Sequence, residues 1–195
     1  MGYKHVNYLE FLETNGWNIR HTDERPVRKG QTFSYRDLGL SSASLKMLQK
    51  YPDGIYAHQK ATIQSFLDGK NVVMTTSTAS GKSLAFQACA TELLSRDPQA
   101  RIAAIYPLKA LATEQFHRWE ALLEDTGLNV KAGRIDGDID VGKRIGILRK
   151  SRVVVFTPDI IHAWLLSNTQ EKAVQDFLRN LSLVVLDEAH TYSGV

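Results

Sequence analysis

Short runs of β-branched and other apolar residues alternate along the chain with longer segments of mixed polarity. The short runs predict strands at residues 71–76, 101–106, 128–132, 152–156 and 182–186. The longer segments predict helices at residues 57–67, 82–95, 109–124, 140–150, 158–167 and 171–180. Strands that alternate with such helices need crossover connections. The pattern therefore predicts an α/β fold with a mostly parallel sheet and helices on both faces.

The predicted strands are almost continuously apolar. The runs VVMTT, IAAIY, VVVF and LVVL contain no charged residue, which is typical of parallel strands that are buried on both faces. Ligands of such sheets bind beyond the carboxyl ends of the strands. The residues that follow each strand are therefore the candidates for chemistry.

The first part of the chain has a different pattern. A short helix is expected at residues 6–13, and several Gly and Pro residues then interrupt any regular element. A second helix is expected at residues 41–51, with a serine at its N-terminus as the cap. We therefore expect an N-terminal arm of residues 1–54 and a single, incomplete domain of residues 55–195.

The composition is that of a globular protein in a reducing compartment. Of the 195 residues, 43% are hydrophobic and 23% are charged, which excludes wholesale disorder. The apolar runs are strand-sized and no secretory signal is visible, so a membrane protein is not expected. The single cysteine, Cys89, excludes an internal disulfide and a zinc cluster, and it favours a cytoplasmic or other intracellular location.

The charge is concentrated in one part of the sequence. The chain has a formal net charge of +3, whereas residues 130–152 contain seven Lys or Arg and three Asp. Such a window is either a solvated surface helix or a face that contacts phosphates. Charge alone favours the solvated helix.

The segment after the first predicted strand has the residues of a phosphate-binding loop. They are Thr76, Ser77, Thr78, Ala79, Ser80, Gly81, Lys82 and Ser83. Loop amides and the positive end of the following helix would hold a β-phosphate. The Lys82 ammonium would lie between the β- and γ-phosphates, and the Ser83 hydroxyl would ligate Mg²⁺. Thr76 departs from the generic pattern, which has glycine there, and an incidental Gly-Lys-Ser is the alternative.

Two carboxylates follow the last predicted strand. Asp187 and Glu188 stand directly after the run LVVL, where Asp187 can hold the hydration shell of a metal ion. Glu188 can orient and deprotonate an attacking water. Together with the phosphate-binding loop, the two carboxylates predict a two-part nucleotide site that also holds Mg²⁺.

With these segments in this order, residues 55–195 resemble the first RecA-like domain of a superfamily 2 DExH/DEAH-box helicase. The resemblance implies a P-loop NTPase fold that ends, in this chain, after the DEAH-bearing strand. It implies that Gln59, in a segment similar to the Q motif, reads the adenine edge. It also implies that His190 couples the nucleotide site to a second RecA-like domain.

Three further segments resemble family motifs that grip nucleic acid. The segment YPLKALA resembles motif Ia, RIDGD resembles the next motif, and TPD resembles motif Ib. The resemblance implies nucleic-acid contacts from these segments, and the candidate residues are Pro107, Lys109, Arg134, Thr157 and Pro158.

The details of the signatures are most similar to the MrfA/Hrq-type branch of DNA repair helicases. That resemblance implies ATP-dependent movement on DNA from 3′ to 5′, although helicases of phage-defence systems share much of the signature and RNA stays open. Motif III, the second RecA-like domain and its arginine finger are missing from the sequence. We therefore expect an N-terminal fragment that binds ATP and a single strand but does not unwind. The alternative from another class is a catalytically silent module that binds nucleic acid or serves as a scaffold.

Overall fold

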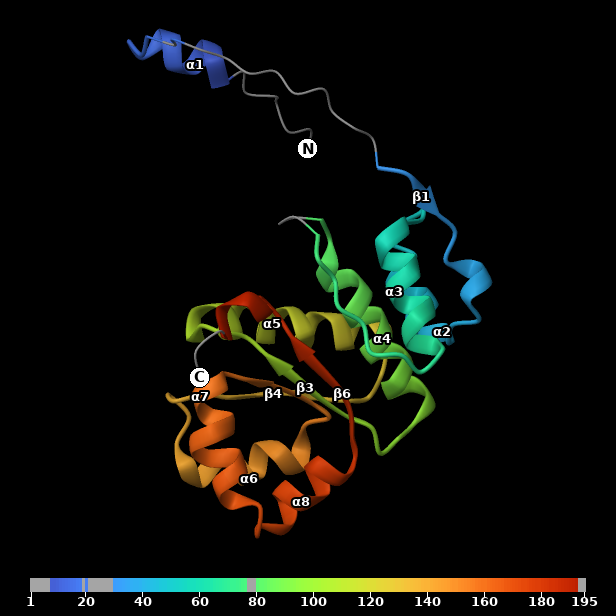
Figure 1. Cartoon of the computed structure of the whole chain (residues 1–195), viewed down its shortest axis with the longest axis vertical. Helices are drawn as coiled ribbons and strands as arrows, with labels where there is room; N and C mark the ends of the chain where they lie inside the picture. Colours follow the sequence, from blue (N-terminus) through green and yellow to red (C-terminus); the bar gives the residue numbers. More distant parts are fainter. Residues whose placement is uncertain (1–7, 19, 21–29, 77–79, 193–195) are drawn as a thin grey trace. The chain divides into compact units, whose positions relative to one another are not determined.

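The chain forms two compact units, residues 1–30 and residues 31–195. Of this chain, the computed structural model (Figure 1) describes residues 8–18, 20, 30–76 and 80–192. In the first unit, helix α1 (Tyr8–Thr14) ends where the Asn15 N–H donates to the Phe11 carbonyl. Gly16 follows with a φ of 80°, a left-handed conformation that glycine adopts without steric cost. The Asn-Gly pair thus ends the helix, as the sequence predicts.

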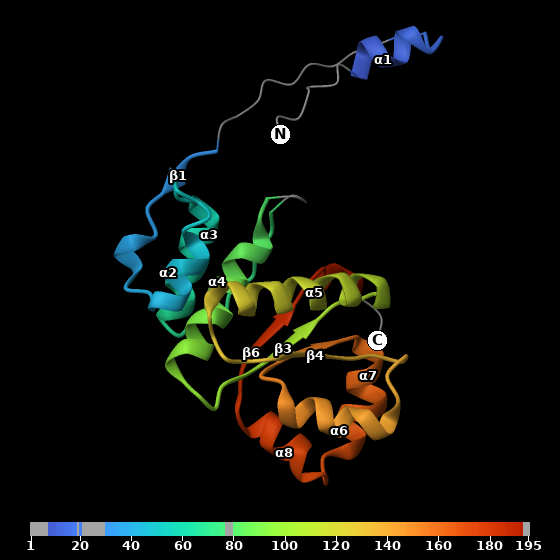
Figure 2. The same cartoon turned by 180° about the vertical axis from the view of Figure 1, so that it is seen from behind.

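The second unit is built on a parallel sheet of four strands, which Figures 1 and 2 show from opposite sides. The strands are β3 (Arg101–Ile105), β4 (Ala132–Ile135), β5 (Val153–Phe156) and β6 (Leu181–Leu186). They lie in the order β4-β5-β3-β6, and every pair is parallel. The α/β architecture expected from the apolar runs is therefore confirmed.

Helices cover both faces of this sheet. Helices α4 (Lys82–Arg96) and α5 (Lys109–Thr126) lie on one face, whereas α6 (Val141–Lys150) and α8 (Lys172–Arg179) lie on the other (Figure 2). Successive strand residues point to opposite faces. Val153 and Val155 of β5 accordingly belong to one apolar cluster, and Val154 and Phe156 belong to the other. Burial on both faces is the reason why β5 is continuously apolar.

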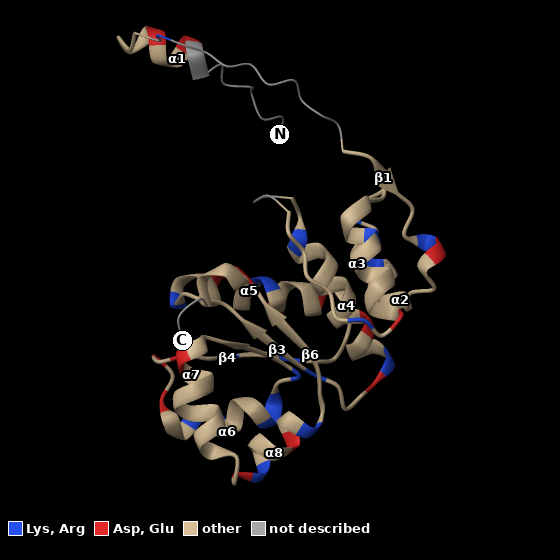
Figure 3. Ribbon diagram, viewed as in Figure 1, with Lys and Arg blue, Asp and Glu red and all other residues tan. Residues whose placement is uncertain are grey.

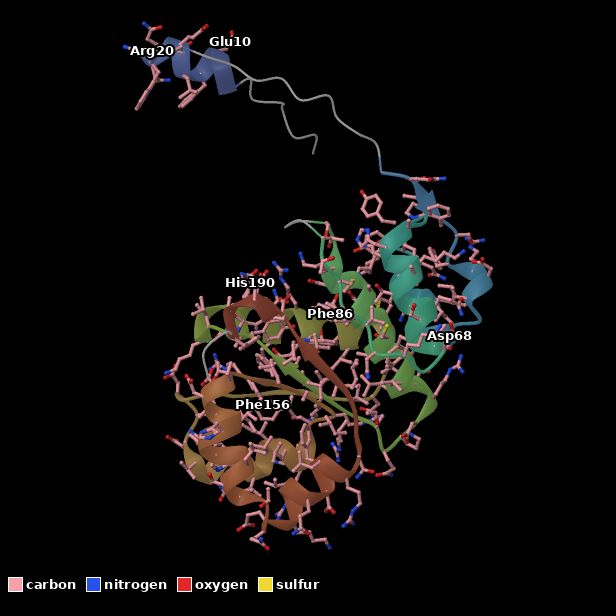
Figure 4. All side chains as sticks on the ribbon, in the orientation of Figure 1. Glu10, Arg20, Asp68, Phe86, Phe156 and His190 are labelled. Atoms are coloured by element: carbon pink, nitrogen blue, oxygen red, sulfur yellow. The ribbon has the colours of Figure 1, made fainter. Side chains whose placement is uncertain are left out.

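Large side chains fill the two clusters. Trp119 of α5 is fully buried, and its indole N–H donates to the Tyr106 hydroxyl at 3.2 Å. On the opposite face lies Phe156 of β5, which is labelled in Figure 4. It packs edge-on against Phe177 of α8, with 5.9 Å between the ring centroids. The hydrogen bond between Trp119 and Tyr106 thus gives both buried polar groups a partner inside the core.

Residues 31–56 pack on the core instead of forming an arm. Strands β1 (Thr32–Phe33) and β2 (Ile55–Tyr56) pair antiparallel, and they flank α2 (Ser42–Leu48). Ser41 caps α2 by accepting from the Ser44 N–H, and its own N–H donates to the buried carboxylate of Glu92 on α4. The chain therefore divides after Gly30, earlier than the expected boundary between residues 54 and 55.

The expected strand at residues 71–76 is wrong. Those residues follow α3 (Ala57–Leu67), but they form no strand, and Val73 is 87% exposed. A strand needs a hydrogen-bonded neighbour, and β6 is the last strand on its side of the described sheet. Two apolar side chains of β6 are correspondingly exposed, Val184 by 46% and Leu186 by 56%.

Two other expected elements differ from the structure. The strand expected at residues 128–132 lies four residues later as β4, because Leu128 and Val130 pack against the core from the connecting segment. The helix expected at residues 158–167 is interrupted. Its parts are α7 (Pro158–Ile160), a π-helical turn (Ile161–Leu165) and a 3₁₀ turn (Leu166–Asn168). The wider π turn buries both Trp164 and Leu165.

Candidate functional site

The described part of the phosphate-binding loop leads directly into α4. Gly81 is the N-cap residue, with a φ of 79°, and Lys82 is the first residue of the helix. A Cβ atom at Gly81 would lie 2.5 Å from the Gln59 side-chain nitrogen, so both backbone conformation and space require glycine. Residues 77–79 of the expected loop, Ser77, Thr78 and Ala79, lie outside the described residues.

Side chains on both ends of the loop hold it together. The Thr76 hydroxyl bonds to the Ser80 hydroxyl at 2.7 Å, and the Lys82 ammonium donates to the Thr76 carbonyl at 3.1 Å. His58 of α3 contacts the Ser80 carbonyl through Nε2 at 3.0 Å. Thr76, the departure from the generic glycine, therefore has a structural role, because only a hydroxyl side chain makes the contact to Ser80.

Gln59 lies beside the loop, but both of its polar atoms are engaged. Its Oε1 accepts from the Tyr56 N–H at 2.9 Å, and its Nε2 donates to the Gly81 carbonyl at 2.8 Å. The side chain is only 3% exposed. In this conformation Gln59 links α3 to the loop, and reading a base edge would require it to exchange at least one of these partners.

The two carboxylates stand at the carboxyl end of β6. The Asp187 N–H still donates to the Ile105 carbonyl of β3 at 3.1 Å, so the sheet fixes its position. Glu188 has a φ of 51°, which makes it the one non-glycine residue with positive φ in the described chain. Its N–H donates to Asp187 Oδ1 at 3.1 Å, and its carbonyl accepts from the Thr191 N–H at 2.9 Å. Such a conformation costs about 1–2 kcal/mol and is typical of functional turns.

Burial, Glu188 and Lys82 all act on the Asp187 carboxyl. Burial is the largest influence, and it raises the pKa of Asp187. The Glu188 N–H that donates to this carboxylate lowers the pKa, the charge of Glu188 raises it, and the Lys82 ammonium lowers it. The end of β6 and the start of α4 therefore share one electrostatic site. A cation placed there would lower the pKa of Asp187 and be attracted in return. Ser83 and Asp187 thus have the chemistry that a hydrated Mg²⁺ needs.

Tyr192 is a neighbour of the site that the sequence motifs did not indicate. It ends the 3₁₀ turn Ala189–Tyr192, and its hydroxyl donates to the Ile105 carbonyl at 3.3 Å. Burial and the charges of Asp187 and Glu188 raise the pKa of Tyr192 to about 12. Its position two residues after DEAH is the signal that could have identified it.

Several of the candidate nucleic-acid-binding residues are buried or already paired with other side chains. Lys109 begins α5, and its ammonium pairs with Asp138 at 2.7 Å. Thr157 is 3% exposed, and Pro158 is the first residue of α7. Arg134 pairs with the buried Asp136 at 3.3 Å and also donates to Thr113. Pro107, the remaining candidate, is half-buried directly after Tyr106.

The basic residues of the window 130–152 do not form one surface. Arg144 is buried and lies over the Trp164 ring at 5.5 Å, whereas Arg152 donates to the carbonyls of Leu94, Asp97 and Ala100. Lys and Arg residues are scattered over several elements in Figure 3. The whole window is therefore neither a solvated helix nor one phosphate-contacting face, because these two guanidinium groups are used inside the fold.

Comparison with known proteins identifies the family. The sequence profile of the DEAD/DEAH box helicases matches residues 56–195. The chain belongs to the DEAD/DEAH box helicase family. It is 34% identical over 192 residues to the ATP-dependent helicase HRQ1 of Saccharomyces cerevisiae, covering 97% of this chain and 17% of that protein. It is 32% identical over 143 residues to the ATP-dependent helicase YprA of Bacillus subtilis, covering 73% and 19%.

Solved structures agree with this assignment. The helicase MrfA bound to DNA and AMPPNP matches with a TM-score of 0.83 at 26% identity, over 97% of this chain and 26% of that one. This DEAD/DEAH box helicase domain thus spans 17–26% of these longer relatives. The expected family and fold are confirmed, and the matches to HRQ1 and MrfA agree with the expected branch.

Two further expectations concern single residues of the helicase domain. His190, labelled in Figure 4, is exposed. Its Nδ1 lies 3.5 Å from Glu188 Oε2, so it contacts the candidate base directly. Cys89 is buried in α4, and burial raises the pKa of its thiol to about 12, which suits an unreactive core residue.

In the described chain, no helix has the length and apolar content required to cross a bilayer.

Proposed function

We propose that this chain is the N-terminal ATP-binding part of an ATP-dependent DNA helicase or translocase. The observation that carries the proposal is the shared electrostatic site of Lys82 and Asp187, with Glu188 held in a strained backbone conformation beside them. Family membership supports ATP as the substrate. Movement from 3′ to 5′ is proposed on the resemblance to the MrfA/Hrq-type branch.

In this proposal each residue of the site has one role. Lys82 and the loop amides bind the phosphates of ATP, and Ser83 and Asp187 hold Mg²⁺, which neutralises phosphate charge when it is bound. Glu188 accepts the proton of the attacking water. Gln59 keeps the Gly81 carbonyl, and so the start of α4, in place.

Nucleic acid is proposed to bind near the carboxyl ends of β3 and β5. Asp138 raises the pKa of the Lys109 ammonium most, through a hydrogen bond and its charge, and the charges of Asp136 and Asp159 raise it less. Strands β3 and β5 are parallel neighbours, and the Tyr106 N–H donates to the Phe156 carbonyl at 3.0 Å. The segment of Pro107 and Lys109 therefore begins beside the segment of Thr157 and Pro158. A phosphate there would have to displace Asp138 from Lys109. DNA is favoured because the matching MrfA structures contain DNA, and RNA is the alternative.

The open side of the sheet supports a longer functional protein. Val184 and Leu186 on β6 and Val73 on the neighbouring unpaired segment are exposed apolar residues. A further strand that paired with β6 would cover them and would allow residues 71–76 to join the sheet. We propose that the remainder of a longer chain supplies this strand and the second RecA-like domain.

Calorimetric titration with ATP and Mg²⁺ tests the nucleotide site. Lys82→Ala removes a charge-assisted contact worth about 1.5–3 kcal/mol, so the affinity should fall about tenfold or more. Lys172→Ala, at the first position of α8, is the matched control and should bind as the parent does. An unchanged affinity of the Lys82 variant would refute the assignment.

A further inference from the structure

A second surface lies along the opposite edge of the sheet from the nucleotide site. Its groove, the β4-edge groove, has a volume of about 670 Å³ and runs between α5 and α6 beside β4. Phe116 of α5, Ala132 of β4 and Ile147 of α6 supply apolar surface inside it. Two strands separate β4 from β6, so the groove is not part of the site built around Asp187.

Strand β4 presents unused backbone groups to this groove. In the described chain β4 pairs only with β5. The Lys131 carbonyl accepts from the N–H groups of Arg152 at 2.9 Å and Val153 at 3.4 Å. The N–H and C=O groups of a trans peptide point in opposite directions, so the Ala132 N–H points away from β5. An outer strand of this kind is a template for another strand.

The charges around the groove have one sign. Its lining contains Lys131, Arg134, Lys143 and Lys150 and no Asp or Glu. Arg134 and Lys143 are paired with Asp136 and Asp140, respectively. Lys131 and Lys150 are exposed and have no carboxylate partner in the described part of the chain. An occupant that brings carboxylates would therefore find two available cations at the rim.

The wall formed by α6 leaves room for a main chain. Gly142 and Gly146 lie one turn apart on the face of α6 that lines the groove, and a Cβ atom at either would meet nothing within 4 Å. Glycine is a poor helix former, so two of them on one helix face are unfavourable for α6 itself. They keep the groove wide at the level of β4.

We propose that the β4-edge groove binds an extended acidic segment of a partner protein, which adds as a strand to β4. The partner backbone would bond to the outward groups of β4, and its carboxylates would lie near Lys131 and Lys150. A peptide fits better than nucleic acid, because a strand edge pairs with another peptide backbone and the groove floor is apolar. This binding activity is independent of ATP and of the proposed motor function.

Fluorescence anisotropy with a labelled peptide of alternating glutamate and valine tests this proposal. The complete chain should bind the peptide, and affinity should fall as salt rises. Charge reversal at both rim residues, Lys131→Glu with Lys150→Glu, should weaken binding about tenfold or more. The control reverses two exposed charges on α8, Lys172→Glu with Arg179→Glu, and should bind as the parent does.

Strand addition is tested separately from charge. Ala132→Pro removes the outward N–H at the first position of an edge strand, where proline is tolerated, and should weaken binding. A peptide N-methylated at alternate positions should fail to bind the unaltered chain, which provides the same test if the proline variant does not fold.

Three results would overturn the proposal. The first is no peptide binding, or equal loss in the rim and control variants. The second is undiminished binding of the N-methylated peptide, which would show charge attraction without strand pairing. The third concerns labelled oligothymidylate. If the unaltered chain binds it but not the acidic peptide, and the rim variant loses this binding, the groove is a nucleic-acid surface.

Discussion

Substitution of Gly81 by alanine should separate two structural demands on the phosphate-binding loop. Gly81 has a φ of 79°, and a Cβ atom there would lie 2.5 Å from Gln59 Nε2. Alanine at this position is therefore destabilised both by the left-handed backbone conformation and by the close approach of its Cβ atom to Gln59. Gly69 has nearly the same φ, 78°, but a Cβ atom there would meet nothing within 4 Å. Gly69→Ala is thus a control for the backbone conformation alone.

The expected magnitudes differ for the two variants. A left-handed alanine costs about 1–2 kcal/mol, which is the whole effect expected of Gly69→Ala. In Gly81→Ala, the Cβ atom also displaces the Gln59 amide from the Gly81 carbonyl. Gln59 is buried, so the lost hydrogen bond adds about 1–3 kcal/mol. The free energy of unfolding should therefore fall by about 2–5 kcal/mol in this variant.

Urea unfolding of four proteins measures this difference. They are Gly69→Ala, Gly81→Ala, Gln59→Ala and the Gln59→Ala/Gly81→Ala double variant. When Gln59 is already alanine, Gly81→Ala should cost only the backbone term, so the two sites should couple by about 1 kcal/mol or more. Equal losses in Gly69→Ala and Gly81→Ala would refute the argument that the Gln59 contact constrains the loop.

Four further predictions concern catalysis, pH, stability and binding. In a longer chain with the second domain, Glu188→Gln should keep ATP affinity and slow hydrolysis about 10²–10⁴-fold; turnover within a few-fold of the parent would exclude Glu188 as the base. Burial by itself raises the pKa of Glu92, but hydrogen bonds from Ser and Arg side chains and from the backbone hold it below its usual value. The ionised Glu92 therefore stabilises the fold above the usual glutamate pKa, and this stability is lost as pH falls through the lowered pKa of the folded state. Glu92→Gln should remove this dependence and flatten the acid side of the pH–stability curve measured by urea unfolding. Gly146→Ala should raise the free energy of unfolding by about 1 kcal/mol, whereas Gly133→Ala, whose Cβ would collide with Ser151, should lower it; equal denaturant midpoints would contradict this. The isolated chain should bind single-stranded DNA with an affinity that falls as salt rises, and the Lys109→Ala variant should bind more weakly than the parent. Neither protein should displace a strand in the presence of ATP, and strand displacement would contradict the fragment interpretation.

Local sequence pattern was sufficient to predict several elements of the fold. Helix α3 has the predicted bounds, and the predicted starts of β3, α4 and α5 are correct. The phosphate-binding residues and the carboxylates were recognisable because their chemistry requires particular side chains next to each other in the chain. Strand ends and helix starts then placed Lys82 and Asp187 at the same edge of a parallel sheet.

Features that depend on partners far away in the sequence could not be predicted from local pattern. Residues 71–76 have a strand-like sequence, but no described strand lies beside them to accept their hydrogen bonds. Arg144 and Arg152 are basic in sequence, yet the Trp164 ring and the carbonyls near Ala100 remove them from any phosphate-binding surface. Gln59 could have faced a base, but folding brings it to the Gly81 carbonyl. In each case the outcome depends on contacts between residues far apart in the chain, and local pattern contains no information about which of those contacts form.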